Sequence, residues 1–292
     1  YWSGCRKAVD EFFIGSNIQP KLNKIDSTGV WLEKTGSVNF QPTSKLLNLG
    51  CGNKFHSDWE NVDYISSNPA VKQYNLSNGI PYEEEIFDVV YHSHLLEHFP
   101  KNKAELFLKE CYRVLKPGGT IRVVIPDLEM IARNYIDLLE KSLKGDKVAQ
   151  EKYDWIMLEM LDQIVRNSSG GEMLKYLGQQ KIPAEDFIIE RFGSEARNII
   201  DGLKNRNIKD IQNGLATLTA EEIGKFRLSG ENHQWMYDRY SLQCILEKSG
   251  FKNTKLCTAY NSRIPDFQKY FLDVEQNGAV RKPDSLFMEA EK

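Results

Sequence analysis

The sequence lacks the features that would direct it to a membrane or to an oxidising compartment. It contains no apolar run of about 18 residues, the length at which a membrane-spanning helix is expected. Its opening residues lack the basic start and long apolar segment of a signal peptide. The five cysteines are scattered and form no CxxC pair, so neither a disulfide framework nor a zinc site is predicted. These absences favour a cytoplasmic protein with reduced thiols.

An excess of basic residues is also missing. The formal net charge is −3, whereas nucleic-acid-binding proteins usually carry a clear positive signature. Nucleic acid is therefore not expected as a partner. The 292 residues are 41% hydrophobic and 27% charged, which is ordinary for a globular protein, and a chain of this length has a prior of about two domains.

Short apolar segments bounded by turn residues predict a sheet. The seven predicted strands cover residues 45–50, 60–64, 71–75, 87–91, 120–125, 252–259 and 285–291. Apolar residues at helical spacing predict helices over 103–115 and 239–250, the first ending at Lys116-Pro-Gly-Gly119. This alternation indicates an α/β fold built on a doubly wound, mostly parallel, seven-stranded sheet.

Two segments do not follow that alternation. Residues 128–232 lose the strand signals and show helical periodicity over 128–144, 147–167 and 184–205, which predicts a large helical insert after the fifth strand. Residues 1–44 show weak periodicity and are expected to form a helical or irregular N-terminal cap.

The first strand ends in a glycine-containing turn, Gly50-Cys51-Gly52. Glycines at this place let the backbone approach a ligand in the crevice at the carboxyl end of the strand. Asp63, at the end of the second strand, could accept hydrogen bonds from both hydroxyls of a ribose. It follows Gly52 by far less than the roughly 20 residues of a dinucleotide-binding fingerprint, and Phe55 replaces the third glycine, so NAD is disfavoured. So short a crossover predicts a first helix reduced to about one turn, packed down by Trp59.

Four motifs in this order resemble those of the class I S-adenosylmethionine-dependent methyltransferases, specifically the type 11-like group: LLNLGCG, NVDY, FDVVYHSHLLEHF and ECYRVLKPGGTIRVVIPDL. The segment from Trp235 to Phe251 is similar in sequence to the last core helix and strand of the same group. The resemblance covers residues 45–127 and 233–292 and implies a Rossmann-like core there, with S-adenosylmethionine as cofactor. The insert at 128–232 carries none of the motifs and is expected to be a lid that binds the methyl acceptor.

The resemblance also implies which residues bind the cofactor. They are Gly50, Cys51 and Gly52 at its methionine part, Asp63 and Tyr64 at its ribose, Asn75 and Leu76 at its adenine, and Ser93 and His94 beneath its sulfonium. Asn48 stands where many members carry an acidic residue that contacts the cofactor's ammonium group through water, and Asn75 replaces the usual Asp. Both departures are expected to weaken individual contacts without affecting the fold.

Several residues are candidates for a base that takes up the acceptor's proton. His94 follows the fourth strand and is expected either to line the cofactor pocket or to act as base, whereas His92 is expected to pack in the core. His98 is expected chiefly as a helix-capping residue or a structural partner of Glu97. His233, at the return from the insert, and Asp127, after the fifth strand, are rival candidates.

The position of Glu97 argues against a metal site. On a helix it would point away from His94 and His98, so no metal is predicted there.

The resemblance implies methyl transfer to an oxygen or nitrogen of a small or medium-sized acceptor. A sugar hydroxyl or a specialised metabolite is the first expectation, and a peptide or protein side chain is the second. A third reading is a scaffold that has kept the fold and lost catalysis: Asn48 and Asn75 fit it, whereas Gly50, Gly52 and Asp63 argue against it.

Overall fold

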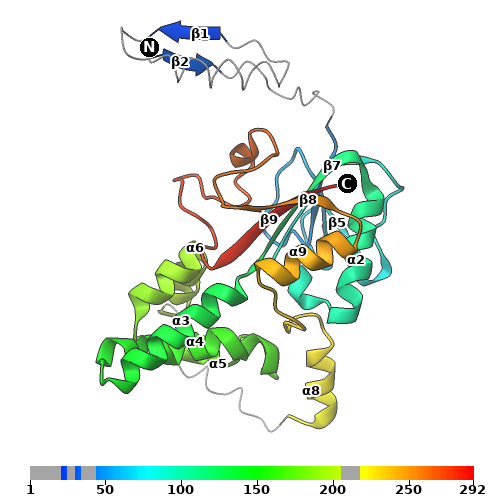
Figure 1. Cartoon of the computed structure of the whole chain (residues 1–292). Coiled ribbons are helices and arrows are strands. Elements are labelled where there is room, and N and C mark those ends of the chain that lie inside the picture. The colour runs from blue at the N-terminus through cyan, green and yellow to red at the C-terminus, as the bar shows by residue number, and fades with distance from the viewer. Residues whose placement is uncertain (1–20, 25–29, 34–43, 205–217) are drawn as a thin grey trace. The chain divides into compact units, whose positions relative to one another are not determined.

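The computed structural model describes residues 21–24, 30–33, 44–204 and 218–292 (Figure 1). The chain divides into two compact units, Tyr1–Ser44 and Lys45–Lys292. In the first unit, β1 (Lys21–Lys24) and β2 (Val30–Glu33) pair antiparallel. The helical or irregular structure expected for this segment is therefore wrong at these two strands, and the rest of that expectation lies outside the described residues.

The second unit is built on a seven-stranded sheet with the order β5-β4-β3-β6-β7-β9-β8. Its strands are β3 (Leu46–Leu49), β4 (Glu60–Asp63), β5 (Val71–Gln73), β6 (Phe87–Ser93), β7 (Leu115–Pro126), β8 (Lys252–Cys257) and β9 (Ser285–Glu291). The ladders from β5 to β7 are parallel, and β9 pairs antiparallel with both of its neighbours. The predicted mostly parallel α/β sheet is confirmed.

The strand order places a crevice at a defined point of the sheet. β3 lies between β4 and β6, so the chain leaves β3 toward one side and later returns on the other. In open α/β sheets, ligands bind outside the carboxyl ends of the strands at such a switch point. The turn after β3 and the residues after β6 therefore meet at the place where a ligand is expected.

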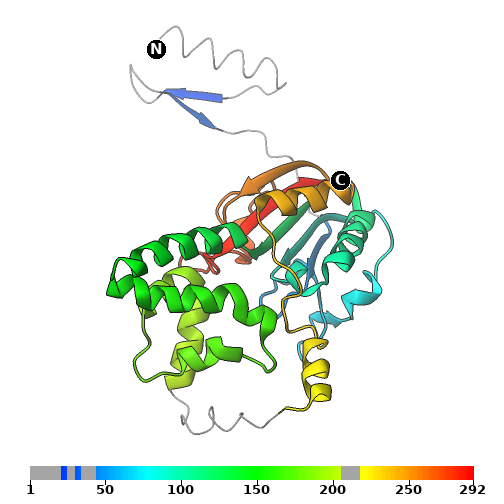
Figure 2. The ribbon, with the colours of Figure 1, turned by 60° about the horizontal axis from the view of Figure 1, so that its bottom comes forward.

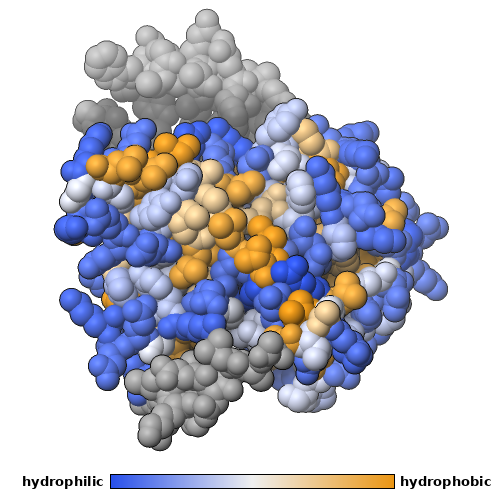
Figure 3. Space-filling view, turned by 90° about the horizontal axis from the view of Figure 1, so that it is seen from below, coloured by the Kyte–Doolittle hydropathy of each residue, from blue (hydrophilic) through white to orange (hydrophobic). Residues whose placement is uncertain are grey.

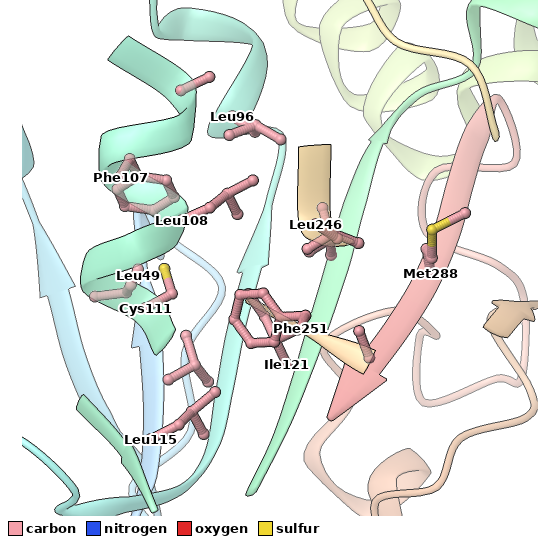
Figure 4. Close-up of a cluster of buried hydrophobic side chains, with 14 of the residues drawn as sticks. Leu49, Leu96, Phe107, Leu108, Cys111, Leu115, Ile121, Leu246, Phe251 and Met288 are labelled. Atoms are coloured by element: carbon pink, nitrogen blue, oxygen red, sulfur yellow. The ribbon is translucent and has the colours of Figure 1, made fainter. Parts of the chain in front are cut away.

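Two helices cover one face of the sheet. α2 (Lys101–Val114) and α9 (Arg239–Lys248) pack their apolar stripes onto it, as Figure 4 shows for Phe107, Leu108 and Cys111 of α2. Leu246 of α9 and Phe251 after it join the same cluster. These side chains are almost completely buried, and burying a large apolar side chain contributes about 1.5–3 kcal/mol.

The opposite face is covered largely by the connection between β8 and β9, which includes the 3-10 helix η3 (Phe267–Tyr270). Trp59 packs edge-on against Tyr91 and Tyr270, with ring centroids 6.0 and 5.3 Å apart. Trp59 thus has the packing role predicted for it. The predicted one-turn helix before it is wrong, because residues 50–59 form only turns between β3 and β4.

Between β7 and α9 the described residues form mainly helices, as predicted. The helices are α3 (Leu128–Leu143), α4 (Lys147–Val165), α5 (Gly171–Leu177), α6 (Glu185–Lys204) and α8 (Ala220–Arg227). α3 and α4 pack side by side (Figure 2), and Trp155, Ile188 and Ile200 belong to a separate apolar core within this insert. A buried ion pair between Arg191 and Glu159 joins α6 to α4.

The insert also contacts the end of the sheet. The backbone N–H of Asp284, just before β9, donates to the carbonyl oxygen of Arg191 at 2.9 Å. Figure 3 views the side on which the insert lies and shows apolar residues gathered in the middle of a largely hydrophilic face. Within the described ranges, no helix has both the length and the apolar character needed to cross a bilayer.

Candidate active site

The turn after β3 depends on its two glycines. Gly50 and Gly52 have φ angles of +62° and +52°, a region that disfavours other residues. A Cβ at Gly50 would lie 2.8 Å from Cδ1 of Leu95, which follows β6. At Gly52 it would meet no atom of the described residues within 4 Å. The turn is thus packed against the β6 end at Gly50 and open at Gly52, as a cradle for a ligand requires.

Asp63 stabilises this turn and flanks the open space. Its Oδ2 accepts a hydrogen bond of 2.7 Å from the Gly52 N–H, and its Oδ1 accepts one of 3.2 Å from the N–H of Ile65. A carboxylate has about four acceptor sites, so two remain for hydroxyl donors. Tyr64 and Ile65 beside it are 60% and 74% exposed and offer apolar surface. These residues fit the ribose and base of S-adenosylmethionine, the cofactor implied by the resemblance.

Four other expected cofactor residues have local structural roles. The Asn48 amide is buried and donates to the Lys54 carbonyl and to the side chain of Asn61, both at 3.1 Å, so it holds the loop in place. Asn75 Oδ1 caps the 3-10 helix η1 (Leu76–Asn78), and Leu76 belongs to the core. Burial, and then the nearby carboxylate, raise the pKa of the Cys51 thiol to about 12.

A cavity of about 520 Å³ lies between the carboxyl edge of the sheet and the helical insert. His94, His98, Pro126, His233, Lys282 and Asp284 line it from the sheet and its connections. The insert contributes apolar residues that include Trp155, Leu177, Ile188 and Phe192, together with Gln163, Arg166 and Glu195. The aromatic residues Trp155 and Phe192 thus belong to the apolar core of the insert and also form walls of the cavity.

His94 occupies a strained position at the end of β6. Its φ is +51°, because the strand ends at Ser93 and the chain turns sharply there. His94 therefore neither continues the strand face of His92 nor shares a helix with His98. Its Nε2 lies 2.8 Å from Oγ of Ser285, and burial lowers its pKa.

His92 has the core position predicted for it. It is fully buried, and its ring packs edge-on against Phe107 with centroids 5.4 Å apart. Burial lowers its pKa to about 3, so this imidazole stays neutral.

His98 and His233 both line the cavity and contact each other, with ring centroids 4.9 Å apart and planes at 88°. Burial lowers the pKa of both imidazoles. Glu97 lies beside them, fully buried, and burial raises its pKa to about 8. The expectation that Glu97 points away is wrong, because its Oε1 lies 3.4 Å from Nδ1 of His94.

Asp127, a candidate base from the sequence, does not line the cavity, whereas Asp284 does. Asp127 caps α3 through a 3.1 Å hydrogen bond from the Met130 N–H and is not among the cavity residues. Asp284 lines the cavity, and burial, followed by the charge of Glu159, raises its pKa to about 7. No local pattern marks Asp284, because it reaches the cavity only through the return of the chain into β9.

Part of the sequence core matches a known protein family. Residues 56–123 match a family model described as a methyltransferase domain. No curated protein matches the sequence.

Weak structural likenesses extend over most of the chain. A methyltransferase from Archaeoglobus fulgidus shares 13% identity, with 87% of this chain and 88% of that one covered and a TM-score of 0.36. A possible histamine N-methyltransferase from Thermotoga maritima shares 13% identity, covers 87% and 84%, and has a TM-score of 0.35. At these scores the likenesses carry no weight in assigning a function.

Proposed function

We propose that this chain, a class I S-adenosylmethionine-dependent methyltransferase, methylates an oxygen or nitrogen of a small or medium-sized acceptor. The observation that carries the proposal is the cavity at the carboxyl ends of β6 and β7. Its volume of about 520 Å³ lies in the range of small-molecule sites, roughly 300–1,000 Å³. The helical insert forms one wall, so it would select the acceptor.

The cofactor would be held by the turn after β3. Gly50 and Gly52 shape the cradle, Asp63 offers acceptors to the ribose hydroxyls, and Tyr64 offers an exposed ring. Because Leu95 packs against Gly50 and follows His94, this cradle adjoins the cavity. Bound S-adenosylmethionine supplies an already activated methyl group, so the chain mainly has to hold the acceptor in line with it.

The walls of the cavity fit a polyhydroxy acceptor such as a sugar. Arg166, Lys282, Glu195 and Asp284 supply donors and acceptors, while Trp155 supplies a flat apolar surface. Arg166 is paired with Glu231 at 3.2 Å and Lys282 with Glu195 at 2.9 Å, so neither is an uncompensated positive charge. This balance favours a neutral acceptor over a strongly anionic one.

A hydroxyl acceptor must lose its proton, and the cavity offers unprotonated imidazoles for this purpose. His94, His98 and His233 all have pKa values lowered by burial, so each is neutral near pH 7 and able to accept a proton. His94 directly follows β6 and lies next to the glycine turn. We therefore assign it the role of base.

The test measures formation of S-adenosylhomocysteine by the full chain with sugars, sugar derivatives, phenols, amines and peptides. Turnover with a sugar or another small hydroxyl compound is expected, with His94→Gln lowering the rate by about 100-fold or more. His56→Gln, outside this cavity, is the matched control and should retain the wild-type rate. Turnover with peptides alone would refute the small acceptor, and no turnover with any class would favour the silent scaffold.

A further inference from the structure

The carboxylate of Glu97 is an unusual group in this fold. Glu97 has no solvent exposure. Neither of its carboxylate oxygens accepts a hydrogen bond from any residue in the described parts of the chain. Leaving a buried polar group without a partner is costly, so native proteins almost always supply one. The carboxylate lies beside two imidazoles, those of His98 and His233, which line the cavity.

The three side chains form a compact set of ligand atoms. One oxygen of Glu97 and one nitrogen each of His98 and His233 lie within 4.8 Å of one another. Two imidazoles with one carboxylate form a common ligand set for divalent first-row transition metals, and three protein ligands leave coordination positions open. Hard cations such as Mg²⁺ prefer oxygen ligands, so they fit this set less well.

The surroundings orient these ligands. His98 Nδ1 donates to the carbonyl oxygen of Asn232 at 3.3 Å, which leaves Nε2 with a free lone pair. Metal-binding histidines usually make such a bond with their second nitrogen. Asn232 is itself fixed, because its amide donates to the carbonyl oxygens of Ile164 and Arg166 at the end of α4.

The backbone brings His233 to Glu97. The N–H groups of Gln234 and Trp235 both donate to the carbonyl oxygen of Glu97, at 2.7 and 3.2 Å. The N–H of His233 donates to the carbonyl oxygen of Gln163 in α4 at 2.9 Å. The site therefore joins the segment after β6, the helical insert and the return to α9 through backbone hydrogen bonds.

We propose that Glu97, His98 and His233 bind a divalent transition-metal ion, such as Zn²⁺, Mn²⁺ or Fe²⁺, where the two histidines line the acceptor cavity. Because His98 and His233 line the cavity, the open coordination positions face it. There the ion binds an oxygen of the acceptor and favours its deprotonated form. This role rests on the proposed function and restricts the acceptor to one with a metal-binding hydroxyl, whereas the binding site itself does not depend on methyl transfer.

The test uses Co²⁺ as the probe, with the full chain freed of metal by a chelator. Equilibrium dialysis and visible absorption should show one Co²⁺ per chain, bound through nitrogen ligands and displaced by Zn²⁺. Glu97→Gln and His233→Gln should each weaken Co²⁺ binding by about 100-fold or more, since even loss of an outer partner costs about 10–100-fold. His56→Gln, a histidine outside the cluster, should bind as the wild type does.

Binding of S-adenosylhomocysteine, measured on the same samples, separates this proposal from the methyltransferase assignment. We expect binding of S-adenosylhomocysteine to persist in the metal-free wild type and in Glu97→Gln. A wild-type chain that takes up no Co²⁺, or Glu97→Gln and His233→Gln chains that bind it as tightly as the wild type, would overturn the metal site. The wild-type measurement decides the matter even if a variant does not fold, and neither result touches the cofactor site.

Discussion

Replacing Arg122 by Met is expected to destabilise the second unit strongly. Arg122 lies in β7 with no solvent exposure, and all of its N–H groups are engaged. It forms ion pairs of 2.7 Å with both Asp273 and Glu289, which are also buried. Its remaining donors bond to the carbonyl oxygens of Asn261 and Thr258 at 3.1 and 2.8 Å.

The expected magnitude follows from the two carboxylates left behind. Met fills a similar volume but leaves Asp273 and Glu289 buried without their shared positive charge. Removing one partner of a buried ion pair costs about 3–5 kcal/mol, so we expect Arg122→Met to lower the free energy of unfolding by at least that amount at pH 7.5. Replacing the whole cluster, as in Arg122→Met with Asp273→Asn and Glu289→Gln, should cost less than the single change.

Urea unfolding followed by circular dichroism measures both variants. Burial raises the pKa of Asp273, and the Arg122 charge opposes that rise. In Arg122→Met the pKa of Asp273 therefore rises further in the folded state, so stability is lost as pH rises above the unfolded value of about 4. The difference from wild type should therefore shrink from pH 7.5 to pH 5. A loss below about 1 kcal/mol, or a triple variant less stable than Arg122→Met, would refute this reasoning.

Three further predictions concern the glycine turn, a cavity carboxyl and the thiols. Gly52→Ala should lower the free energy of unfolding in urea by only about 1–2 kcal/mol, because its Cβ enters open space. The same variant should bind S-adenosylhomocysteine more than tenfold more weakly in calorimetry. Gly50→Ala, whose Cβ meets Leu95, should be the less stable of the two variants. Asp284→Asn, unfolded in the presence of a chelator, should match the wild type at pH 4 and be more stable at pH 8 by up to about 4 kcal/mol. The reason is that burial raises the carboxyl pKa to about 7 in the folded state, so the wild type loses stability as pH rises from about 4 to 7. Equal stability of the two proteins at pH 8 would contradict this prediction. In a Cys5→Ser background at pH 8, a thiol reagent should label exposed Cys244 at once and the buried Cys51 only on unfolding, and fast labelling at Cys51 would contradict its burial.

The sequence predicted those parts of the fold that local patterns encode. The strands and α2, α3, α4 and α9 carry clear periodicity and end signals, and each lies close to its predicted range. The glycine turn and Asp63 were found because a tight turn and a strand end are local features. The hairpin of β1 and β2 and the short helices α5 and α8 escaped because they offer too few residues for a periodic pattern.

The arrangement of Glu97, His98 and His233 could not be predicted in the same way. The left-handed turn at His94 and the 3-10 helix η2 (Leu96–His98) decide where Glu97 points, and neither has a reliable local signal. His233 reaches Glu97 only through backbone bonds that span more than a hundred residues of chain. The prediction from residue spacing assumed a regular helix, and it therefore gave the wrong direction for the Glu97 side chain.

Calorimetric titration with S-adenosylhomocysteine is the first experiment to do, because we propose that the turn after β3 holds S-adenosylmethionine. We expect binding at one site per chain, weakened at least tenfold by Asp63→Ala through loss of hydrogen bonds to the ribose. Asp58→Ala, an exposed carboxylate in the same loop, is the control and should bind as the wild type does. A wild-type chain that does not bind S-adenosylhomocysteine, or an Asp63→Ala chain that binds it equally well, would contradict the account.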